Sequence, residues 1–266
     1  MCAPGKLLFF DIDGTIITQD SYVIPLSTIR AIRKARDNGH IAIINTGRPF
    51  GHIETKIRDI GFDGFICTCG MHVQFHDMIL KDVHLPIELC LFIRDFSREC
   101  KVEMAFESTD AMIFEDPNIA ISHNILDKKR SHAEAGIPII IGTDYYGFQF
   151  DKFLAWKSSA TDWDRFFEVI KCYFYVINHY DLFECIPIGY SKATGVKDLI
   201  KYLGIPIIDT FAFGDSQNDL LMLKSVGTSV LMGNAPDTLK SEADYIAPNI
   251  TDDGLEYALN YLNLLG

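Results

Sequence analysis

Two aspartates one residue apart, Asp11 and Asp13, follow a run of four apolar residues near the start of the chain. Four consecutive apolar residues, Leu7 to Phe10, are typical of a strand buried on both faces. Carboxylates have no place inside such a strand, so we expect both aspartates just past its end, where the chain turns at Gly14. Because two carboxylates this close repel each other, the rest of the sequence must supply compensating groups.

Two further apolar strands end in polar residues that a structural role does not explain. One is followed by Asn45-Thr46-Gly47-Arg48, and the other by GDSQND at residues 214–219. Ligands of open parallel sheets bind beyond the carboxyl ends of the strands, so these residues and the aspartate pair should meet on one edge. Ser191-Lys192-Ala193, just before a predicted helix, can bring an ammonium group to the same edge.

Together these stretches resemble the haloacid dehalogenase (HAD) superfamily, and more narrowly its Cof-type phosphatases with a large inserted α/β cap (type C2B). The matching motifs are DIDGT at 11–15, NTGR at 45–48, SKATG at 191–195, GDSQND at 214–219, MGNA at 232–235 and ADYIAPNITDDG at 243–254. They cover the predicted core on both sides of the insertion. One departure is Cys69-Gly70, where such proteins often carry Asn-Gly. Any substrate contact usually made by that asparagine is therefore not carried over.

The resemblance implies a role for each motif. Asp11 is the expected nucleophile that becomes an aspartyl phosphate, and Asp13 is the expected general acid and then general base. The expected Mg²⁺ ligands are the Asp11 carboxylate, the backbone carbonyl of Asp13 and the Asp215 carboxylate, with Asp219 orienting them. The groups expected to hold the phosphoryl oxygens are Thr46, Lys192, Asn218 and the backbone amides of Ile12 and Gly47. Arg48 is left open between a substrate or cap contact and an ion pair with a surface acid.

The charges at this site explain why a metal is expected. Asp11, Asp215 and a phosphate monoester together bring about four negative charges. Like charges about 4 Å apart repel by roughly 4 kcal/mol per pair at an effective dielectric constant near 20. One ammonium group at Lys192 does not offset that repulsion, whereas a divalent cation that prefers oxygen ligands does.

The expected activity is therefore magnesium-dependent hydrolysis of a small phosphorylated metabolite, with a sugar phosphate as one candidate. Two alternatives stay open: a phosphomutase of the same superfamily, and a non-catalytic metabolite-sensing protein. A dehalogenase is disfavoured because it would need no acid at Asp13. The sequence does not indicate an oligomeric state.

The elements that must position these residues alternate between strands and helices at both ends of the chain. The pattern predicts strands at 6–10, 41–45, 64–67, 210–213 and 228–231, helices at 25–38, 50–60, 195–203, 218–224 and 252–264, and a hairpin of 73–75 with 78–80. Such alternation predicts a doubly wound parallel sheet, a Rossmann-like α/β core. We expect this core to comprise residues 1–83 and 188–266.

Residues 84–187 follow a different pattern, which predicts an inserted α+β cap domain. We expect helices at 87–100 and 163–172, strands at 102–107, 111–114, 149–154, 173–179 and 182–187, and a less regular stretch up to Gly147. Tight connections between successive strands favour an antiparallel sheet. Substrate specificity is expected to lie in this domain.

Composition limits the kind of partner. The formal net charge of −12 argues against nucleic acid or an anionic membrane as the main partner, while a small anionic substrate remains compatible with a metal. The seven cysteines are irregularly spaced and mostly in apolar runs, which favours free thiols in a reducing cytoplasm. No apolar stretch approaches membrane-spanning length, so we expect a soluble, cytoplasmic protein.

Several other residues invite a functional interpretation, but a structural one is favoured. His72 and His76 are interpreted as part of a solvated hairpin, and Cys67 and Cys69 as two residues on one strand face. Packing is favoured for Tyr145, Tyr146 and Phe148 over a role in a substrate pocket. The basic run at residues 127–130 is interpreted as a solvated loop.

Overall fold

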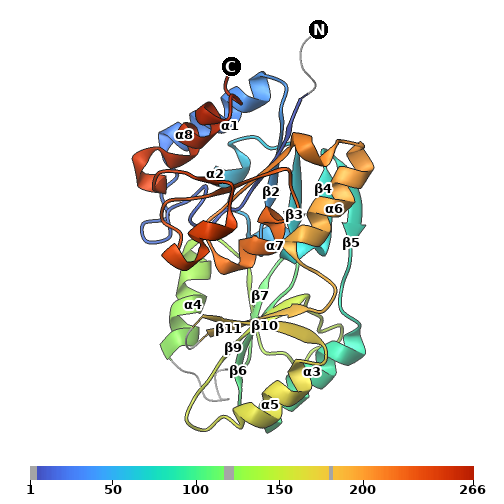
Figure 1. The fold of residues 1–266 in the computed structure, drawn as a ribbon. Helices are drawn as coiled ribbons and strands as arrows, with labels where there is room; N and C mark the ends of the chain where they lie inside the picture. The colour runs from blue at the N-terminus through green and yellow to red at the C-terminus, as the bar shows by residue number, and fades with distance from the viewer. Residues whose placement is uncertain (1–4, 117–122, 180–181) are drawn as a thin grey trace. The chain divides into compact units, whose positions relative to one another are not determined.

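The computed structural model describes residues 5–116, 123–179 and 182–266, which form two compact units (Figure 1). The core unit comprises the chain up to Gly47, Thr55–Asp82 and Ser191–Gly266. The inserted unit comprises Arg48–Glu54 and Val83–Tyr190. The chain therefore passes between the units four times: before and after the short segment Arg48–Glu54, and before and after Val83–Tyr190.

The core unit is built on an eight-stranded sheet with the order β14-β13-β12-β1-β2-β3-β4-β5. Strands β14 to β3 run parallel to their neighbours, and β3, β4 and β5 pair antiparallel. All four residues of β1 have no exposed surface, as expected for a central strand covered on both faces. The strands are β1 (Leu7–Phe10), β2 (Ile41–Asn45), β3 (Gly64–Cys67), β4 (His72–Phe75), β5 (Met78–Asp82), β12 (Thr210–Gly214), β13 (Thr228–Leu231) and β14 (Tyr245–Ile246).

Helices cover both faces of this sheet. Leu7 and Phe9 pack with residues of α6 and α7, and because side chains alternate along a strand, Leu8 and Phe10 point to the opposite face. Helices α1 and α8 lie side by side (Figure 1). The α-helices are α1 (Leu26–Asp37), α2 (Thr55–Arg58), α6 (Lys192–Leu203), α7 (Leu220–Leu223) and α8 (Gly254–Tyr261). The 3₁₀ helices of this unit are η2 (Thr68–Gly70), η3 (Ile207–Asp209), η4 (Gln217–Asp219), η5 (Asp237–Glu242) and η6 (Ile250–Asp252).

The inserted unit is a six-stranded sheet with the order β10-β11-β9-β6-β7-β8, antiparallel except for the β7–β8 pair. Helices α3 and α5 pack on one face through a cluster rich in phenylalanine, and α4 packs near β6 and β8. The strands are β6 (Glu103–Glu107), β7 (Met112–Phe114), β8 (Ile139–Ile141), β9 (Lys152–Trp156), β10 (Phe174–His179) and β11 (Leu182–Pro187). The helices are η1 (Phe50–His52), α3 (Ile87–Glu99), α4 (His123–Glu134) and α5 (Trp163–Ile170).

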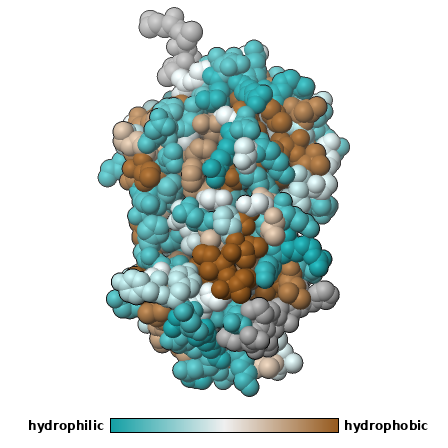
Figure 2. All heavy atoms as spheres, turned by 180° about the vertical axis from the view of Figure 1, so that it is seen from behind, coloured by the Kyte–Doolittle hydropathy of each residue, from teal (hydrophilic) through white to brown (hydrophobic). Residues whose placement is uncertain are grey.

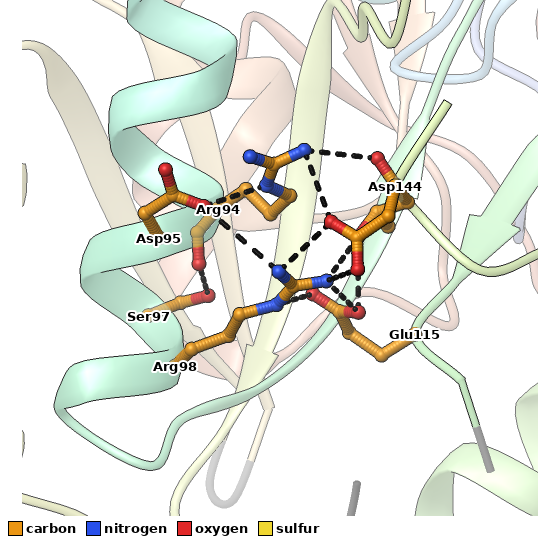
Figure 3. A network of polar contacts seen from close by, with 7 residues as sticks. Arg94, Asp95, Ser97, Arg98, Glu115 and Asp144 are labelled. Atoms are coloured by element: carbon orange, nitrogen blue, oxygen red, sulfur yellow. Dashed lines mark hydrogen bonds and ion pairs between the residues drawn. The ribbon is translucent and has the colours of Figure 1, made fainter. Parts of the chain in front are cut away.

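A network of charged side chains holds α3 to the loops beyond β7 and β8 (Figure 3). Arg98 donates to both carboxylate oxygens of Glu115, at 3.1 and 3.0 Å, and to those of Asp144, at 3.0 and 3.1 Å. Arg94 donates to the carbonyl of Thr143. Paired donors matched to paired acceptors fix the orientation of the guanidinium group, so the network sets how α3 lies on the sheet.

Hydrophobic side chains also reach the surface of both units, as the brown areas of Figure 2 illustrate for one face. In the inserted unit Ile140 and Ile141 of the edge strand β8 are 38% and 44% exposed, and in the core unit Ile207 and Ile208 are 57% and 70% exposed. Exposed apolar side chains are ordinary on the surfaces of globular proteins. Among the residues described, none of the helices is both long and apolar enough to cross a membrane.

The structure confirms the α/β fold class and corrects several element boundaries. The strands predicted at 41–45, 64–67, 182–187 and 228–231 occur as expected. The helix predicted at 50–60 is instead η1, an extended stretch and the single turn α2, because Arg48–Glu54 packs with the inserted unit. The helix predicted at 252–264 is interrupted at Asp253, whose φ is +56°.

The largest error lies in the stretch up to Gly147, which was expected to be irregular. It contains α4 and β8, and the basic run at 127–130 lies in α4 rather than in a loop. Only Ile125 is buried among the α4 residues whose burial is described, so this helix lacks the apolar periodicity that sequence analysis needs. The strand predicted at 149–154 is displaced towards the C-terminus, to Lys152–Trp156.

Candidate active site

The turn after β1 places Asp11 at the edge of the core sheet. The Asp11 amide donates to the carbonyl of Phe213 at 3.0 Å, and the residue is 3% exposed. The carbonyl of Ile12 then accepts from three successive amides, those of residues 15, 16 and 17. Gly14 closes the turn with a φ of +79°, and a Cβ there would lie 1.9 Å from Asp215 Oδ2. Glycine is therefore required both for the backbone conformation and for space.

Asp13 lies on the same turn but is only half-buried. Its negative charge contributes to raising the pKa of both Asp11 and Asp215, so the three carboxylates are within electrostatic reach of one another. The turn thus gives a nearly buried carboxylate and a more exposed one from residues only two apart.

Lys192, the first residue of α6, supplies the positive charge. Its Nζ lies 2.6 Å from Asp11 Oδ1, 2.6 Å from Asp219 Oδ1 and 3.3 Å from Asn218 Oδ1. The helix was expected to start at residue 195; it starts at Lys192 because Ser191 is the N-cap of a capping box with Thr194. Lys192 as a residue is 2% exposed, so its ammonium group is fixed among its partners rather than solvated.

Burial is the largest single influence on the pKa of each of these groups. It raises the pKa of Asp11 well above its usual range, helped by the charge of Asp219 and opposed by Lys192. Burial and Asp219 likewise raise the pKa of Asp215 to about 7. For Lys192, burial alone would lower the pKa, but the carboxylates of Asp11 and Asp219 outweigh it and hold the pKa above its usual range.

The loop after β12 is organised by its own last aspartate. Asp219 has no exposed surface, and its Oδ2 accepts from the amides of Asp215 and Ser216, both at 3.0 Å. Its other oxygen faces Lys192, as described above. Asp219 therefore connects the loop that carries Asp215 to the ammonium group of α6.

Two residues not singled out from the sequence hold the Asp215 carboxylate. Gln19 and Asn234 donate to Asp215 Oδ2 at 2.9 and 3.2 Å, and Asn234 also donates to the carbonyl of Gly14 at 2.8 Å. The MGNA motif contained Asn234, but Gln19 lies outside every motif. Asp215 Oδ1 is buried without a hydrogen-bond partner.

The arrangement fits a hard divalent cation. Among the described residues, Asp11, Asp215 and Asp219 form a group whose carboxylate oxygens lie within 4.8 Å of one another. Buried polar atoms are normally partnered, so the unpartnered Asp215 Oδ1 next to other carboxylates fits a positively charged ligand at this position. Carboxylate oxygens are the ligands that Mg²⁺ prefers.

The loop after β2 is held by backbone hydrogen bonds to β3 and to the turn that follows it, and the side chain of Asn45 links the end of β2 to Lys192. The Thr46 amide donates to the carbonyl of Ile66 at 2.8 Å, and its own carbonyl accepts from the Cys69 amide at 3.2 Å. Asn45, another residue without a role assigned from the sequence, donates from Nδ2 to the Lys192 carbonyl at 3.1 Å. The N-terminus of α6 is thus fixed to the end of β2.

Cys69 lies in a left-handed turn rather than on a strand face. Thr68, Cys69 and Gly70 have φ values of +49°, +52° and +85°. A Cβ at Gly70 would lie 2.5 Å from the Ser191 carbonyl, so the turn packs directly against the start of α6. The expectation that Cys67 and Cys69 share a strand face was wrong, because β3 ends at Cys67.

The structure brings together Asp11, Asp13, Asp215, Asp219, Asn218 and Lys192, and it places Ile12 and Thr46 on loops of the same core unit. Gly47 is the last residue of that unit before the segment Arg48–Glu54. Arg48 Nη1 lies 3.8 Å from Glu54 Oε2, so the two residues form an ion pair within this segment. The side chain of Glu54 is largely buried.

The remaining candidates differ in how far they are buried. His72 is buried with its Nδ1 2.9 Å from Asp82 Oδ1, so the hairpin is not simply solvated as expected. Phe148 has no exposed surface, whereas Tyr145 is 40% exposed and Tyr146 fully exposed. Packing thus explains Phe148 but not Tyr146.

Comparison with known proteins agrees with this fold and site. The family model of the haloacid dehalogenase-like hydrolases matches residues 8–259. The chain is 32% identical over 267 residues to a Bacillus subtilis (strain 168) protein named "Putative phosphatase YkrA", covering 98% of this chain and 99% of the relative. The chain belongs to the haloacid dehalogenase-like hydrolases. Membership and the aspartate-rich site together make it an enzyme of the HAD phosphatase class.

Solved structures show the same fold over nearly the whole chain. A crystal structure of a protein from Geobacillus kaustophilus HTA426 is similar with a TM-score of 0.84 and 29% identity, covering 98% of this chain and 99% of that one. The HAD subclass IIB sugar phosphatase BT4131 is similar with a TM-score of 0.79 and 25% identity, covering 97% and 99%.

Proposed function

We propose that this enzyme is a magnesium-dependent phosphatase that hydrolyses a small phosphorylated metabolite through an aspartyl-phosphate intermediate. The observation that carries the proposal is the contact of Lys192 Nζ with Asp11 Oδ1 at 2.6 Å, beside the unpartnered oxygen of Asp215. A nucleophilic carboxylate and a positive group that can hold phosphoryl oxygens are thereby adjacent. The similarity to a sugar phosphatase makes sugar phosphates the first substrates to test.

Two displacements at phosphorus account for the reaction. In the first, an oxygen of Asp11 forms a bond to phosphorus while the ester P–O bond breaks, and Asp13 gives its proton to the leaving oxygen. In the second, Asp13 takes a proton from water as the water oxygen attacks phosphorus, and the Asp11–phosphorus bond breaks. The products are the alcohol and inorganic phosphate, and both aspartates return to their starting states.

The chain's own groups would hold the transferring phosphoryl oxygens. Lys192 and Asn218 lie next to Asp11, and Thr46 follows the neighbouring strand. Together with the amides of Ile12 and Gly47, these groups are proposed as donors to oxygens that stay charged throughout the transfer. We propose the carboxylates of Asp11 and Asp215 and the Asp13 carbonyl as the metal ligands, where Mg²⁺ would neutralise charge on the phosphate.

We also propose that the enzyme acts in the cytoplasm. The six described cysteines are free thiols, which suits the reducing cytoplasm. We propose that the partner is a small phosphorylated metabolite in that compartment.

Phosphate release from a panel of phosphorylated metabolites tests the proposal. We expect release in MgCl₂, none in EDTA, and none from Asp11→Asn in either condition. Asp237→Asn, which changes an exposed aspartate of the core unit, is the matched control and should retain full activity. Isomerised product, or a bisphosphate, would instead indicate a phosphomutase. Metabolite binding without turnover by a folded protein that binds magnesium would indicate a sensor.

A further inference from the structure

The short segment Arg48–Glu54 is anchored to the inserted unit by close backbone contact. The Gly51 amide donates to the carbonyl of Thr109 at 2.9 Å. A Cβ at Gly51 would lie 2.6 Å from that carbonyl oxygen and 2.9 Å from Asp110 Cα. Because both are backbone atoms, no side-chain movement can make room, so only glycine allows this approach.

His52 forms the second anchor. It is 2% exposed, its ring is hydrogen-bonded to the backbone of Ala111, and it meets the ring of His132 edge-on at a centroid distance of 5.9 Å. The Nε2 atom is buried without a partner, so Nδ1 is the atom that bonds Ala111. The side chain following Gly51 is thus enclosed by the inserted unit.

Thr46, at the start of the loop after β2, is anchored to the core unit. Both its amide and its carbonyl are bonded there, to the backbone of Ile66 and Cys69. Between Thr46 and Gly51 lie four residues, Gly47, Arg48, Pro49 and Phe50, the last of which begins η1. Proline fixes its own φ, here −59°, and restricts the residue before it to extended conformations. Gly47 is therefore the flexible residue between Thr46, which the core unit holds, and the stiffer segment that leads to the inserted unit.

We propose that Gly51 and His52 are positioning residues that tie the Gly47 peptide to the inserted unit. Through this covalent connection the inserted unit sets the position of the Gly47 amide, which is proposed to bind phosphate. Side chains of the inserted unit can contribute to substrate specificity separately. The inference rests on the proposed function, because it takes the Gly47 amide as a donor to phosphate.

Two variants and one control test this connection in the full-length, magnesium-saturated protein. Gly51→Ala forces a Cβ against backbone, and His52→Ala removes the bond to Ala111, whereas His52→Asn keeps a donor where Nδ1 lies. Phe166→Leu is the matched control, because it weakens the packing of α5 in the inserted unit without touching the segment. The readouts are affinity for inorganic phosphate by calorimetry and hydrogen exchange of peptides covering residues 46–54.

We expect Gly51→Ala and His52→Ala to weaken phosphate binding at least fivefold and to speed exchange at residues 47–54 at least tenfold. His52→Asn should keep most of the wild-type phosphate affinity and exchange protection that His52→Ala loses. Phe166→Leu should change neither the phosphate affinity nor the exchange rate at residues 47–54. The inference is overturned if Gly51→Ala and His52→Ala match Phe166→Leu in phosphate affinity, or if exchange at 47–54 stays at the wild-type rate. Neither readout requires turnover, so failure of the wild type to release phosphate from any substrate would be a separate result.

Discussion

One buried ammonium group compensates two buried carboxylates at the centre of the site. Lys192 is 2.6 Å from both Asp11 and Asp219, and all three side chains are at most 5% exposed. Ion pairs in such places are not strong sources of stability, but removal of one partner leaves the other charge without compensation. The site should therefore be sensitive to the loss of Lys192 even before any substrate binds.

Replacing Lys192 with methionine tests this compensation. In EDTA we expect Lys192→Met to lower the free energy of unfolding by roughly 3–5 kcal/mol, because two carboxylates lose their counter-ion. Urea unfolding measures the change. Lys224→Met, which removes an exposed partner of Glu242, should cost less than about 1 kcal/mol. Equal urea midpoints for Lys192→Met and the wild type would show that the carboxylates do not depend on this charge.

The left-handed conformation of Cys69 gives a second test at the scale of one residue. Asparagine and glycine adopt a φ near +52° more readily than other residues, and β-branched residues resist it. We expect Cys69→Asn and Cys69→Gly to keep or increase stability, and Cys69→Val to cost about 1–2 kcal/mol. Cys185→Val, at a buried cysteine in the middle of β11, is the control for loss of a thiol. A cost for Cys69→Asn as large as that for Cys69→Val would argue against the backbone explanation.

At the scale of elements, the cap of α6 links helix stability to the site. Ser191 caps the helix, and the next residue is Lys192. We expect Ser191→Ala to lower stability by about 1 kcal/mol and also to reduce phosphate release, because the start of the helix positions the ammonium group. Asp162→Ala removes the N-cap of α5 in the inserted unit and should affect stability alone. Equal effects of both variants on phosphate release would contradict the link.

Strands β1, β2, β3, β12 and β13 could be predicted because they are short, mainly apolar and mostly buried, and the polar residues that follow β1, β2 and β12 carry motifs. The two-residue strand β14 was not predicted. A continuous helix was wrongly predicted at residues 50–60, because tertiary contacts of Gly51 and His52 with the inserted unit override the local helical preference. Helix α4 was missed because a mostly exposed helix has no apolar stripe.

The candidate site shows the same limit. The aspartates and Lys192 were predicted to lie together because charged residues that follow apolar strands or precede a helix are informative, and their order matches known motifs. Gln19 was not found, because a lone polar residue in a turn gives no signal until the fold brings it 2.9 Å from Asp215. The support of Asn45 for the start of α6 likewise depends on a contact 147 residues away in the chain.

At the scale of the whole molecule, a metal ion should stabilise the core unit. A ligand that binds only the folded state at one hundred times its dissociation constant adds about 2.7 kcal/mol. We expect saturating Mg²⁺ to raise the unfolding temperature by several degrees relative to EDTA, and Asp215→Asn to abolish the increase. Asp237→Asn should keep it, since Asp237 is exposed and lies outside the carboxylate group. An equal shift in Asp215→Asn would place the metal elsewhere.

The inserted unit should lose stability in mild acid for a reason of its own. Burial lowers the pKa of His132 to about 4 and also lowers that of His52, below the 6.5 of an unfolded chain. Between these values the unfolded state binds more protons, so stability is full above pH 6.5 and is lost as pH falls towards the folded pKa. Each histidine can contribute at most about 1.4 kcal/mol per pH unit.

Fluorescence can follow this unit alone, because both tryptophans, Trp156 and Trp163, lie in it. We expect the urea midpoint of tryptophan fluorescence to fall between pH 7 and pH 5, a range in which ordinary carboxylates stay charged. The double variant His52→Gln and His132→Gln should flatten the dependence, since neither glutamine takes up a proton. If the slope persists in the double variant, other groups carry it. If the wild type shows no slope, both rings already accept protons in the folded unit, and the enclosure of His52 that anchors the segment would be looser than its 2% exposure indicates.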